Sequence, residues 1–229
     1  MNPKRDVKPF DIADYDIHKF NPQNRETQKK FYPYFKSRGI DLYTQYAFHR
    51  HFYLATKHRE DGAAYTNLSF PLTLPKATER LWDLKNEDVH VWTGAAATKA
   101  KPQGAIQARG LWIASPARTS LTSAKHIYWF ESAYDAMHIT NFIRQKIRSC
   151  ERRFFISTGG APSQQQFKGT IKVTPHASHH LCFDHDRAGQ VYAIPLCSHS
   201  CRLELLHLSV TNRQTDCTGQ QRRLIHSMK

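Results

Sequence analysis

Three short apolar runs in the second half of the chain constrain its fold more than any other feature. They are 127–130, 154–156 and 181–183. Each run is apolar throughout rather than at alternate positions, which is typical of parallel strands buried on both faces. After the first run, apolar residues recur at spacings of three and four, the stripe of an amphipathic helix. These residues are Ala136, Ile139, Ile143 and Ile147. Strands that alternate with helices predict an α/β fold, in which helices flank a parallel sheet.

Weaker patterns accompany these runs. The segment 163–168 predicts a helical turn, and 187–196 predicts the start of a helix that Pro195 limits, because proline has no amide hydrogen to donate. From about residue 195 the periodicity is weak, and no clear strand that ends in a pair of aspartates follows. We therefore expect 197–229 to form an irregular basic tail.

The first half of the chain predicts a helix and a hairpin. Aromatic residues within 28–38 indicate a short helix, which Gly39 would end. The runs 51–56 and 65–70 flank the turn signal Glu60-Asp61-Gly62. Because Asp-Gly supplies the positive φ that a tight turn needs, these runs predict two antiparallel strands joined by that turn.

A second strand pair is predicted by the runs 89–92 and 110–114, which are separated by a basic segment rich in Ala, Gly and Gln. A polar linker at 115–125 then divides the two halves of the chain. We therefore expect a smaller basic α+β region with antiparallel strands at 1–120, followed by the parallel sheet at 121–196.

The chain is strongly basic, with 33 Lys and Arg against 19 Asp and Glu, a formal net charge of +14 in 229 residues. Such a surplus attracts polyanions, of which nucleic acid is the commonest. Many basic proteins bind no nucleic acid, so charge alone leaves this partner open. Hydrophobic residues make up 40% of the chain, which is enough for a packed core and argues against wholesale disorder.

The sequence predicts neither a membrane partner nor a disulfide framework. No apolar run approaches the roughly 20 residues that cross a bilayer, and no apolar segment follows the polar first residues as in a secretory signal. The five cysteines are an odd number and lie at or after Cys150, which fits a reducing cytosol. The late cysteines and histidines match none of the usual paired zinc-ligand spacings. We therefore expect a cytoplasmic protein.

Acidic residues and glycines follow the apolar runs where strands would end. Glu131 follows the first run, Gly159 and Gly160 the second, and Asp184 and Asp186 the third. Because functional residues gather at the carboxyl ends of parallel strands, we expect these segments at one sheet edge. Carboxylates suit Mg²⁺, which takes its other ligands from water and substrate phosphate. An Asp-x-Asp pair alone is a weak signal, and the joint occurrence of all three segments is what predicts a metal site.

The same segments resemble the three signatures of a Toprim domain, which DnaG-type primases, topoisomerases, small nucleases and recombination proteins share. They are Phe130-Glu131-Ser132-Ala133-Tyr134-Asp135, Ser157-Thr158-Gly159-Gly160 and Phe183-Asp184-His185-Asp186-Arg187-Ala188-Gly189. Glu-x-x-x-Asp followed by Asp-x-Asp-x-Ala-Gly is most similar to the primase branch. The segment 34–40 also resembles one that precedes Toprim domains in primase-like proteins of phages, plasmids and conjugative elements.

The resemblance implies a role for each site residue. Glu131 would be the general acid or base for an attacking or leaving 3′-oxygen, and Asp135 an accessory acidic residue near the metal. Asp184 and Asp186 would bind Mg²⁺ or Mn²⁺, directly or through water. The two glycines would let the backbone turn beside the site. Phosphoryl transfer needs such a cation because negative charge develops on the phosphate.

The function that the resemblance implies is nucleotidyl transfer for primer synthesis on single-stranded DNA, by a protein of a mobile element. A helicase or a relaxase would be a partner in trans. Because the same carboxylates serve synthesis and cleavage, a Toprim nuclease is an alternative. A non-catalytic DNA-binding or mobilisation accessory protein with an incomplete site is a third interpretation.

Basic and aromatic residues are the candidates for nucleic-acid contact, because Lys and Arg bind phosphates and aromatic rings stack on bases. The basic candidates are Lys99, Lys101, Arg109 and Arg187. The aromatic candidates, which more often belong to a core, are Tyr43, Tyr46, Phe48 and Phe52.

Two departures from the family's pattern stand against the primase interpretation. A primase-type Toprim site has a further acidic motif on the strand after the Asp-x-Asp helix, and here Glu204 and Asp216 are poor substitutes. A truncated or frame-shifted end is one hypothesis for this difference. Many primases also carry an N-terminal zinc module, and residues 1–149 contain no cysteine.

Overall fold

Two β-sheets with helices packed against them make up the structure, a computed structural model. It describes residues 12–73, 80–85, 110–146, 152–184, 186–197 and 203–205. One sheet has four strands and the other has five. The predicted class is confirmed, because a mostly parallel sheet flanked by helices follows a smaller region of antiparallel strands.

The first sheet is antiparallel, and its strands follow one another in space as they do in the chain. They are β1 (Asp16–Lys19), β2 (Tyr53–His58), β3 (Ala64–Thr73) and β4 (Arg80–Lys85). The predicted hairpin is confirmed as β2 and β3. Gly62 in its turn has a φ of +80°, a conformation that residues with a Cβ rarely adopt.

The helices described on this side of the molecule are the 3-10 helix η1 (Ile12–Asp14), α1 (Arg25–Lys36) and α2 (Leu42–Phe48). Helices α1 and α2 begin at polar capping residues. Asn24 caps α1 by accepting hydrogen bonds from the amides of Glu26 and Thr27 at 3.0 and 3.2 Å. Gly39, with a φ of +62°, follows the end of α1 as predicted. Within the described ranges, every helix is too short or too polar to cross a bilayer.

The second sheet is mainly parallel. In spatial order its strands are β5 (Trp112–Ala114), β7 (Arg153–Ser157), β6 (His126–Phe130), β8 (Ser178–Leu181) and β9 (Leu203–Leu205). Strand β5 runs antiparallel to β7, and the other neighbouring strands are parallel. The helices of this half are the 3-10 helix η2 (Leu121–Ser123), α4 (Ala133–Lys146), α5 (Gln164–Val173) and α6 (Arg187–Cys197).

The pairing of β5 corrects the strand pair expected from the sequence. The segment 110–114 hydrogen-bonds to β7 in the second sheet, whereas 89–92, its expected partner, lies outside the described residues. An isolated backbone bridge between Thr73 and Leu111 then links the end of β3 to the start of this segment. A short strand pairs with the edge that the tertiary fold presents, and local sequence does not specify that edge.

Three later elements also differ from expectation. Helix α5 is longer than a helical turn, because Ser163 and Gln166 form a capping box at its start. Helix α6 continues to Cys197 beyond Pro195, since a proline so near the helix end removes little of its hydrogen bonding. Strand β9 forms in the region expected to be irregular, and it pairs in parallel with β8.

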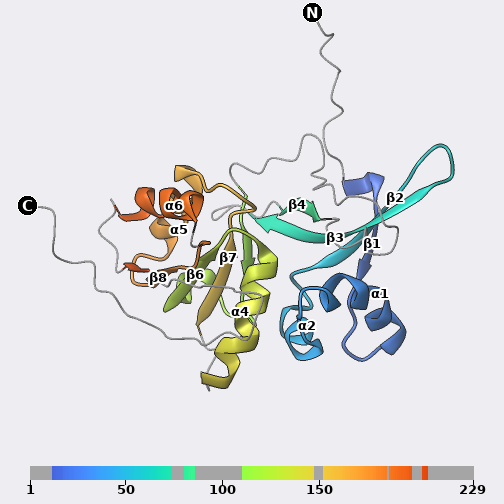
Figure 1. The fold of residues 1–229 in the computed structure, drawn as a ribbon, viewed down its shortest axis with the longest axis horizontal. Helices are drawn as coiled ribbons and strands as arrows, with labels where there is room; N and C mark the ends of the chain where they lie inside the picture. Colours follow the sequence, from blue (N-terminus) through green and yellow to red (C-terminus); the bar gives the residue numbers. More distant parts are fainter. Residues whose placement is uncertain are drawn as a thin grey trace, which may run out of the picture.

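Side chains of the parallel strands alternate between two apolar layers. Tyr128 and Phe130 of β6 belong to the layer that contains α4, whereas Ile127 and Trp129 belong to the layer that contains Phe167 of α5. In Figure 1, α4 lies on one face of this sheet, and α5 and α6 lie on the other. Burial on both faces explains why the strands are continuously apolar in sequence.

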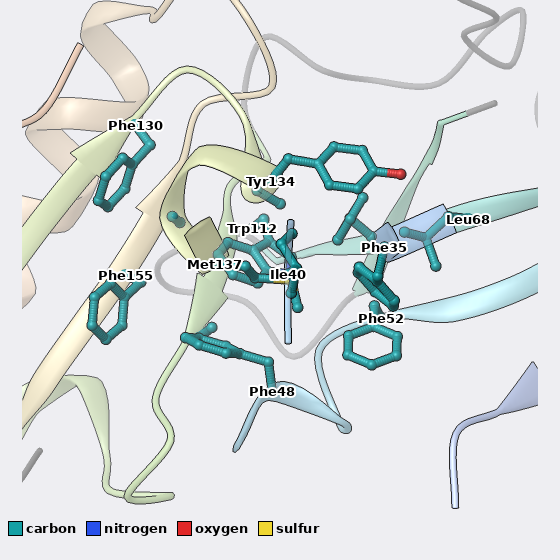
Figure 2. Packing of buried hydrophobic residues seen from close by; sticks show 14 of the residues in the cluster. Phe35, Ile40, Phe48, Phe52, Leu68, Trp112, Phe130, Tyr134, Met137 and Phe155 are labelled. Atoms are coloured by element: carbon teal, nitrogen blue, oxygen red, sulfur yellow. The ribbon is translucent and has the colours of Figure 1, made fainter. Parts of the chain in front are cut away.

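The layer on the α4 face continues into the first region of the molecule, as Figure 2 shows. The ring of Phe48 in α2 lies 5.9 Å from Trp112 and 5.6 Å from Phe155, measured between ring centres. Phe52, beside β2, is fully buried in the same cluster. Truncating one such phenylalanine to alanine costs about 3–5 kcal/mol. The two regions therefore share one core, which fixes α1 and α2 against α4.

The burial of the aromatic side chains decides whether they belong to the core or could stack on bases. Phe48 and Phe52 have no exposed surface and are core residues, so they cannot stack on bases. Tyr46 is partly buried and packs against the same core. Tyr43 remains accessible, with 60% of its surface exposed.

Candidate active site

Two acidic residues meet at the carboxyl edge of the second sheet. Glu131 directly follows β6, and Asp184 lies shortly after the end of β8. The backbone amide of Asp184 donates a hydrogen bond to Oε1 of Glu131 at 3.3 Å, across 53 positions of sequence. Because β6 and β8 are parallel neighbours, residues that follow their carboxyl ends come side by side.

The glycine turn after β7 holds the backbone of Glu131. The carbonyl oxygen of Glu131 accepts hydrogen bonds from the amide of Gly160 at 2.9 Å and from the hydroxyl of Ser157 at 3.1 Å. Gly159 and Gly160 have φ angles of +71° and +121°. Such angles are rarely adopted by residues with a Cβ, so the turn requires glycine at these positions.

Asp135 lies in the first turn of α4, and its carboxylate is held by Ser132. The Ser132 hydroxyl donates to Oδ2 of Asp135 at 2.7 Å and accepts from the Asp135 amide at 3.2 Å. This pair caps the start of α4 and fixes the direction of the Asp135 carboxylate. No function was predicted for Ser132 from the sequence, although a serine three positions before an acidic residue at a helix start is a capping signal.

Asp186 directly precedes α6 and is tied to the backbone of that helix. Its Oδ1 accepts a hydrogen bond from the amide of Gly189 at 2.8 Å. A Cβ at Gly189 would lie 2.0 Å from the carbonyl oxygen of Asp184, so no other residue fits there without moving the chain. Gly189 therefore allows α6 to approach the loop that carries Asp184. Gly189 belongs to the Asp-x-Asp-x-Ala-Gly segment identified in the sequence. Its packing role could not be predicted there, because that role depends on a tertiary contact.

The four carboxylates repel one another. Desolvation, followed by the negative charge of Asp184, raises the pKa of Glu131 above its ordinary value, and the charges of Asp186 and Asp135 add to the rise. Desolvation and the charges of Asp135 and Asp186 likewise raise the pKa of Asp184. An accumulation of negative charge that holds carboxyl pKa values up marks a functional site and is relieved by a bound cation.

The donor atoms of this edge fit a hard divalent cation. They are carboxylate oxygens, which Mg²⁺ prefers. Among the residues that the structure describes, no three His, Cys, Asp or Glu side chains are close enough to hold one metal ion together. An ion at Asp184 and Asp186 would therefore take most of its ligands from water and a substrate phosphate, as Mg²⁺ commonly does in phosphoryl-transfer sites.

A basic side chain reaches the start of α4 from the first region. The guanidinium carbon of Arg38 lies 4.7 Å from the centre of the Tyr134 ring, a cation–π contact. The Arg38 carbonyl also accepts a hydrogen bond from Nδ1 of His138 at 3.1 Å. Arg38 therefore contacts α4, the helix whose first turn carries Asp135. The resemblance at 34–40 included Arg38, but contact with α4 could be known only from the fold.

Of the predicted basic candidates, Arg187 is described and lies exposed at the first position of α6. Lys99, Lys101 and Arg109 lie outside the described residues. Of the tail, 198–202 and 206–229 also lie outside them.

Solved structures with a similar fold include two from bacteriophage T7. One is a chain in the complex of the lagging-strand DNA polymerase with primase domains of two gp4 subunits bound to an RNA/DNA hybrid and dTTP. The match has a TM-score of 0.54 at 11% sequence identity, and it covers 94% of this chain and 89% of that one. The other is the primase fragment of the primase-helicase protein, with a TM-score of 0.54 at 11% identity, over 88% of this chain and 70% of that one.

These similarities are similarities of fold. At 11% identity they establish that the chain folds like a primase fragment, including both the antiparallel region and the parallel sheet. Comparison with protein-family models gives no match, and comparison with curated proteins gives none either.

Proposed function

We propose that the chain is a divalent-metal-dependent, primase-like enzyme with a Toprim domain at 121–196, which transfers nucleotides to a ribonucleotide primer on single-stranded DNA. The observation that carries this proposal is the acidic edge, where the Asp184 amide bonds the Glu131 carboxylate, and where desolvation and the neighbouring acids raise the pKa of Glu131. A fold like that of primase fragments supports it.

In this proposal Glu131 exchanges a proton with the reacting 3′-oxygen. Its raised pKa brings the carboxyl closer to neutral pH, where a general acid or base is most effective. Asp184 and Asp186 would hold Mg²⁺ or Mn²⁺, which when bound neutralises charge that develops on the phosphate. Asp135, oriented by Ser132, would act as an accessory acid near that ion.

Nucleic acid would enter along the basic side chains. The region 1–120 would hold the template through Lys99, Lys101 and Arg109, with Arg38 and Arg187 at the site. Arg38 is supported by its contact with Tyr134 in the first turn of α4, the turn that also carries Asp135. A helicase or a relaxase would act with the protein in trans, and a mobile element is the proposed genetic context.

A non-catalytic DNA-binding role is the second candidate. Two observations favour it: no three described acidic, histidine or cysteine side chains share one ion position, and the Asp186 carboxylate is already engaged in capping α6. A Toprim nuclease with the same carboxylates is the third candidate, because such a site serves cleavage as well as synthesis.

One pair of assays separates these candidates. Labelled ribonucleotides with a single-stranded template and Mg²⁺ report primer synthesis, and a supercoiled plasmid with Mg²⁺ reports nicking. We expect primer synthesis by the wild type and a loss of about 10²–10⁴-fold in Glu131→Gln, the usual contribution of general acid–base catalysis. The matched control is Glu60→Gln, which removes one exposed carboxylate in the hairpin turn and should leave synthesis unchanged.

Nicking without synthesis would favour the nuclease. Equal biological activity of the wild type and Glu131→Gln, with neither reaction detectable, would favour the binding protein.

A further inference from the structure

Gln166 is a buried amide that connects three separate segments of the chain. It lies near the start of α5, and only 1% of its surface is exposed. Its Oε1 accepts a hydrogen bond from the Ser163 amide at 2.7 Å. Its Nε2 donates to the carbonyl of Gly110 at 2.7 Å and to the carbonyl of Thr158 at 3.2 Å. All three bonds use atoms of one rigid, planar group.

The bond to Thr158 leads to the acidic edge. The Thr158 amide donates to the carbonyl of Phe130 at 3.1 Å, and the Thr158 hydroxyl donates to the same carbonyl at 3.3 Å. The next residues of this turn bond the carbonyl of Glu131, through the Gly160 amide at 2.9 Å. A displacement of the turn would therefore move the backbone from which the Glu131 side chain extends.

The chemistry of the position calls for a primary amide. Two buried backbone carbonyls need two N–H donors, and the half-buried Ser163 amide needs an acceptor. Glutamine supplies both donors and the acceptor from one side chain. Glutamate has the same shape but brings a carboxylate against two carbonyl oxygens, and leucine offers none of these hydrogen bonds.

We propose that Gln166 is a positioning residue, which anchors the 157–160 turn to α5 and to Gly110 and so sets the place of Glu131. This inference rests on the proposed function for its catalytic consequence, but the anchoring itself does not depend on it. Gln166 acts on the acidic edge through its hydrogen bond to the Thr158 carbonyl.

The experiment compares Gln166→Glu with Ser163→Ala in the full chain. Ser163→Ala breaks one half of the capping box but keeps both donors of Gln166, whereas Gln166→Glu keeps the acceptor of the box and loses the donors. One readout is the backbone amide resonances of Thr158, Gly159 and Gly160 by nuclear magnetic resonance. The other is kcat and KM for primer synthesis across a range of pH.

We expect Gln166→Glu to shift the resonances of the turn and to lower kcat about tenfold to a hundredfold, since small misplacements of reacting groups have such effects. The KM for nucleotides should change less than about twofold, because substrate contacts are intact. The lost kcat should partly return from about pH 8 to about pH 6, as the new carboxyl takes up a proton and donates again. Ser163→Ala should show none of these changes.

Unmoved turn resonances, or equal kcat in Gln166→Glu and Ser163→Ala, would overturn the proposal. If the wild type synthesises no primer, the proposed function fails while the resonances still decide whether Gln166 anchors the turn. Should Gln166→Glu not fold, hydrogen exchange of the wild-type Gln166 side-chain amide decides instead. Slow exchange supports two buried hydrogen bonds, and exchange at the rate of a free amide contradicts them.

Discussion

The two ends of the parallel sheet carry titratable groups of opposite kind. At the carboxyl edge, desolvation and the charges of neighbouring acids raise the pKa of both Glu131 and Asp184. Toward the amino end, His126 and His180 lie side by side with Nδ1 and Nε2 3.1 Å apart, and the His180 ring stacks on Tyr128 at 4.5 Å between ring centres. The first group is proposed to bind a cation, whereas the second consists of stacked rings.

His179 shows the physical basis of this difference. Its Nδ1 accepts a hydrogen bond from the indole N–H of Trp129 at 3.1 Å, so this nitrogen must stay unprotonated. Burial lowers the pKa of His179 from 6.5 to about 4. A buried imidazole that accepts a hydrogen bond from its neighbour is a structural group, whereas carboxylates crowded at the rim of a sheet are candidates for chemistry.

The largest expected effect concerns the carboxyl edge alone. Gly189→Ala places a methyl group 2.0 Å from the Asp184 carbonyl oxygen, which must displace the loop or α6. We expect primer synthesis to fall about a hundredfold, because a misplaced site loses rate steeply. Ala188→Ser, at the exposed neighbouring position, is the matched control for synthesis under the same conditions. Full activity of Gly189→Ala would show that the close approach of α6 is not required.

The second expected effect concerns His179 and is measured as the pH dependence of the free energy of unfolding. A histidine whose pKa is lower in the folded than in the unfolded state loses its contribution to stability as the pH falls. For His179 this contribution is present above pH 6.5 and is lost as the pH falls toward 4. For His179 the loss is about 2 kcal/mol between pH 7.5 and pH 5. Urea unfolding at both values should show this loss in the wild type. His179→Gln keeps an acceptor for Trp129 but cannot titrate, so its unfolding free energy should vary less with pH.

The third effect is on metal binding at the carboxyl edge. Asp184→Asn removes one charged ligand, and we expect it to weaken Mg²⁺ binding at least tenfold from a value in about the millimolar range. Calorimetric titration of both proteins measures the difference, with Glu60→Gln as a charge-matched control. Equal binding by the wild type and Asp184→Asn would contradict the metal assignment.

The smallest expected effect is on the stability of the fold and concerns Glu131 at the carboxyl edge. Because the pKa of Glu131 is raised, its stabilising contribution is present at low pH and is lost as pH rises through the folded pKa. In metal-free buffer at neutral pH, Glu131→Gln should therefore stabilise the fold by a few tenths of a kcal/mol, a small value because the group is partly solvated. Thermal unfolding with and without Mg²⁺ measures it. A lower melting temperature for Glu131→Gln without metal would mean that repulsion at this edge is not significant.

The hairpin, α1, α4 and the parallel strands could be predicted from local patterns. Asp61-Gly62 indicated the turn between β2 and β3, and the continuous apolar runs indicated strands buried on both faces. The expected convergence of segments on one edge follows from the rule for parallel strands, and Glu131 and Asp184 do meet there. Their catalytic and metal-binding roles stay predictions.

Other features had no local signal. The edge position of β5 depends on which neighbour is available, and β9 is three residues long with no pattern of its own. The aromatic residues near 48–52 are compatible with a binding surface or a core, and the contact of Phe48 with Phe155 makes them core. The anchoring role of Gln166 joins residues from three segments that are distant in sequence.

The type and order of most elements were therefore legible in the chain, because strands buried on both faces are continuously apolar and amphipathic helices repeat every 3.6 residues. Which hydrogen bonds orient the carboxylates, which aromatic residues are buried and which glutamine holds the turn depended on the folded arrangement. Packing and electrostatic interactions act through space, so groups more than fifty residues apart interact as soon as parallel strands bring them together.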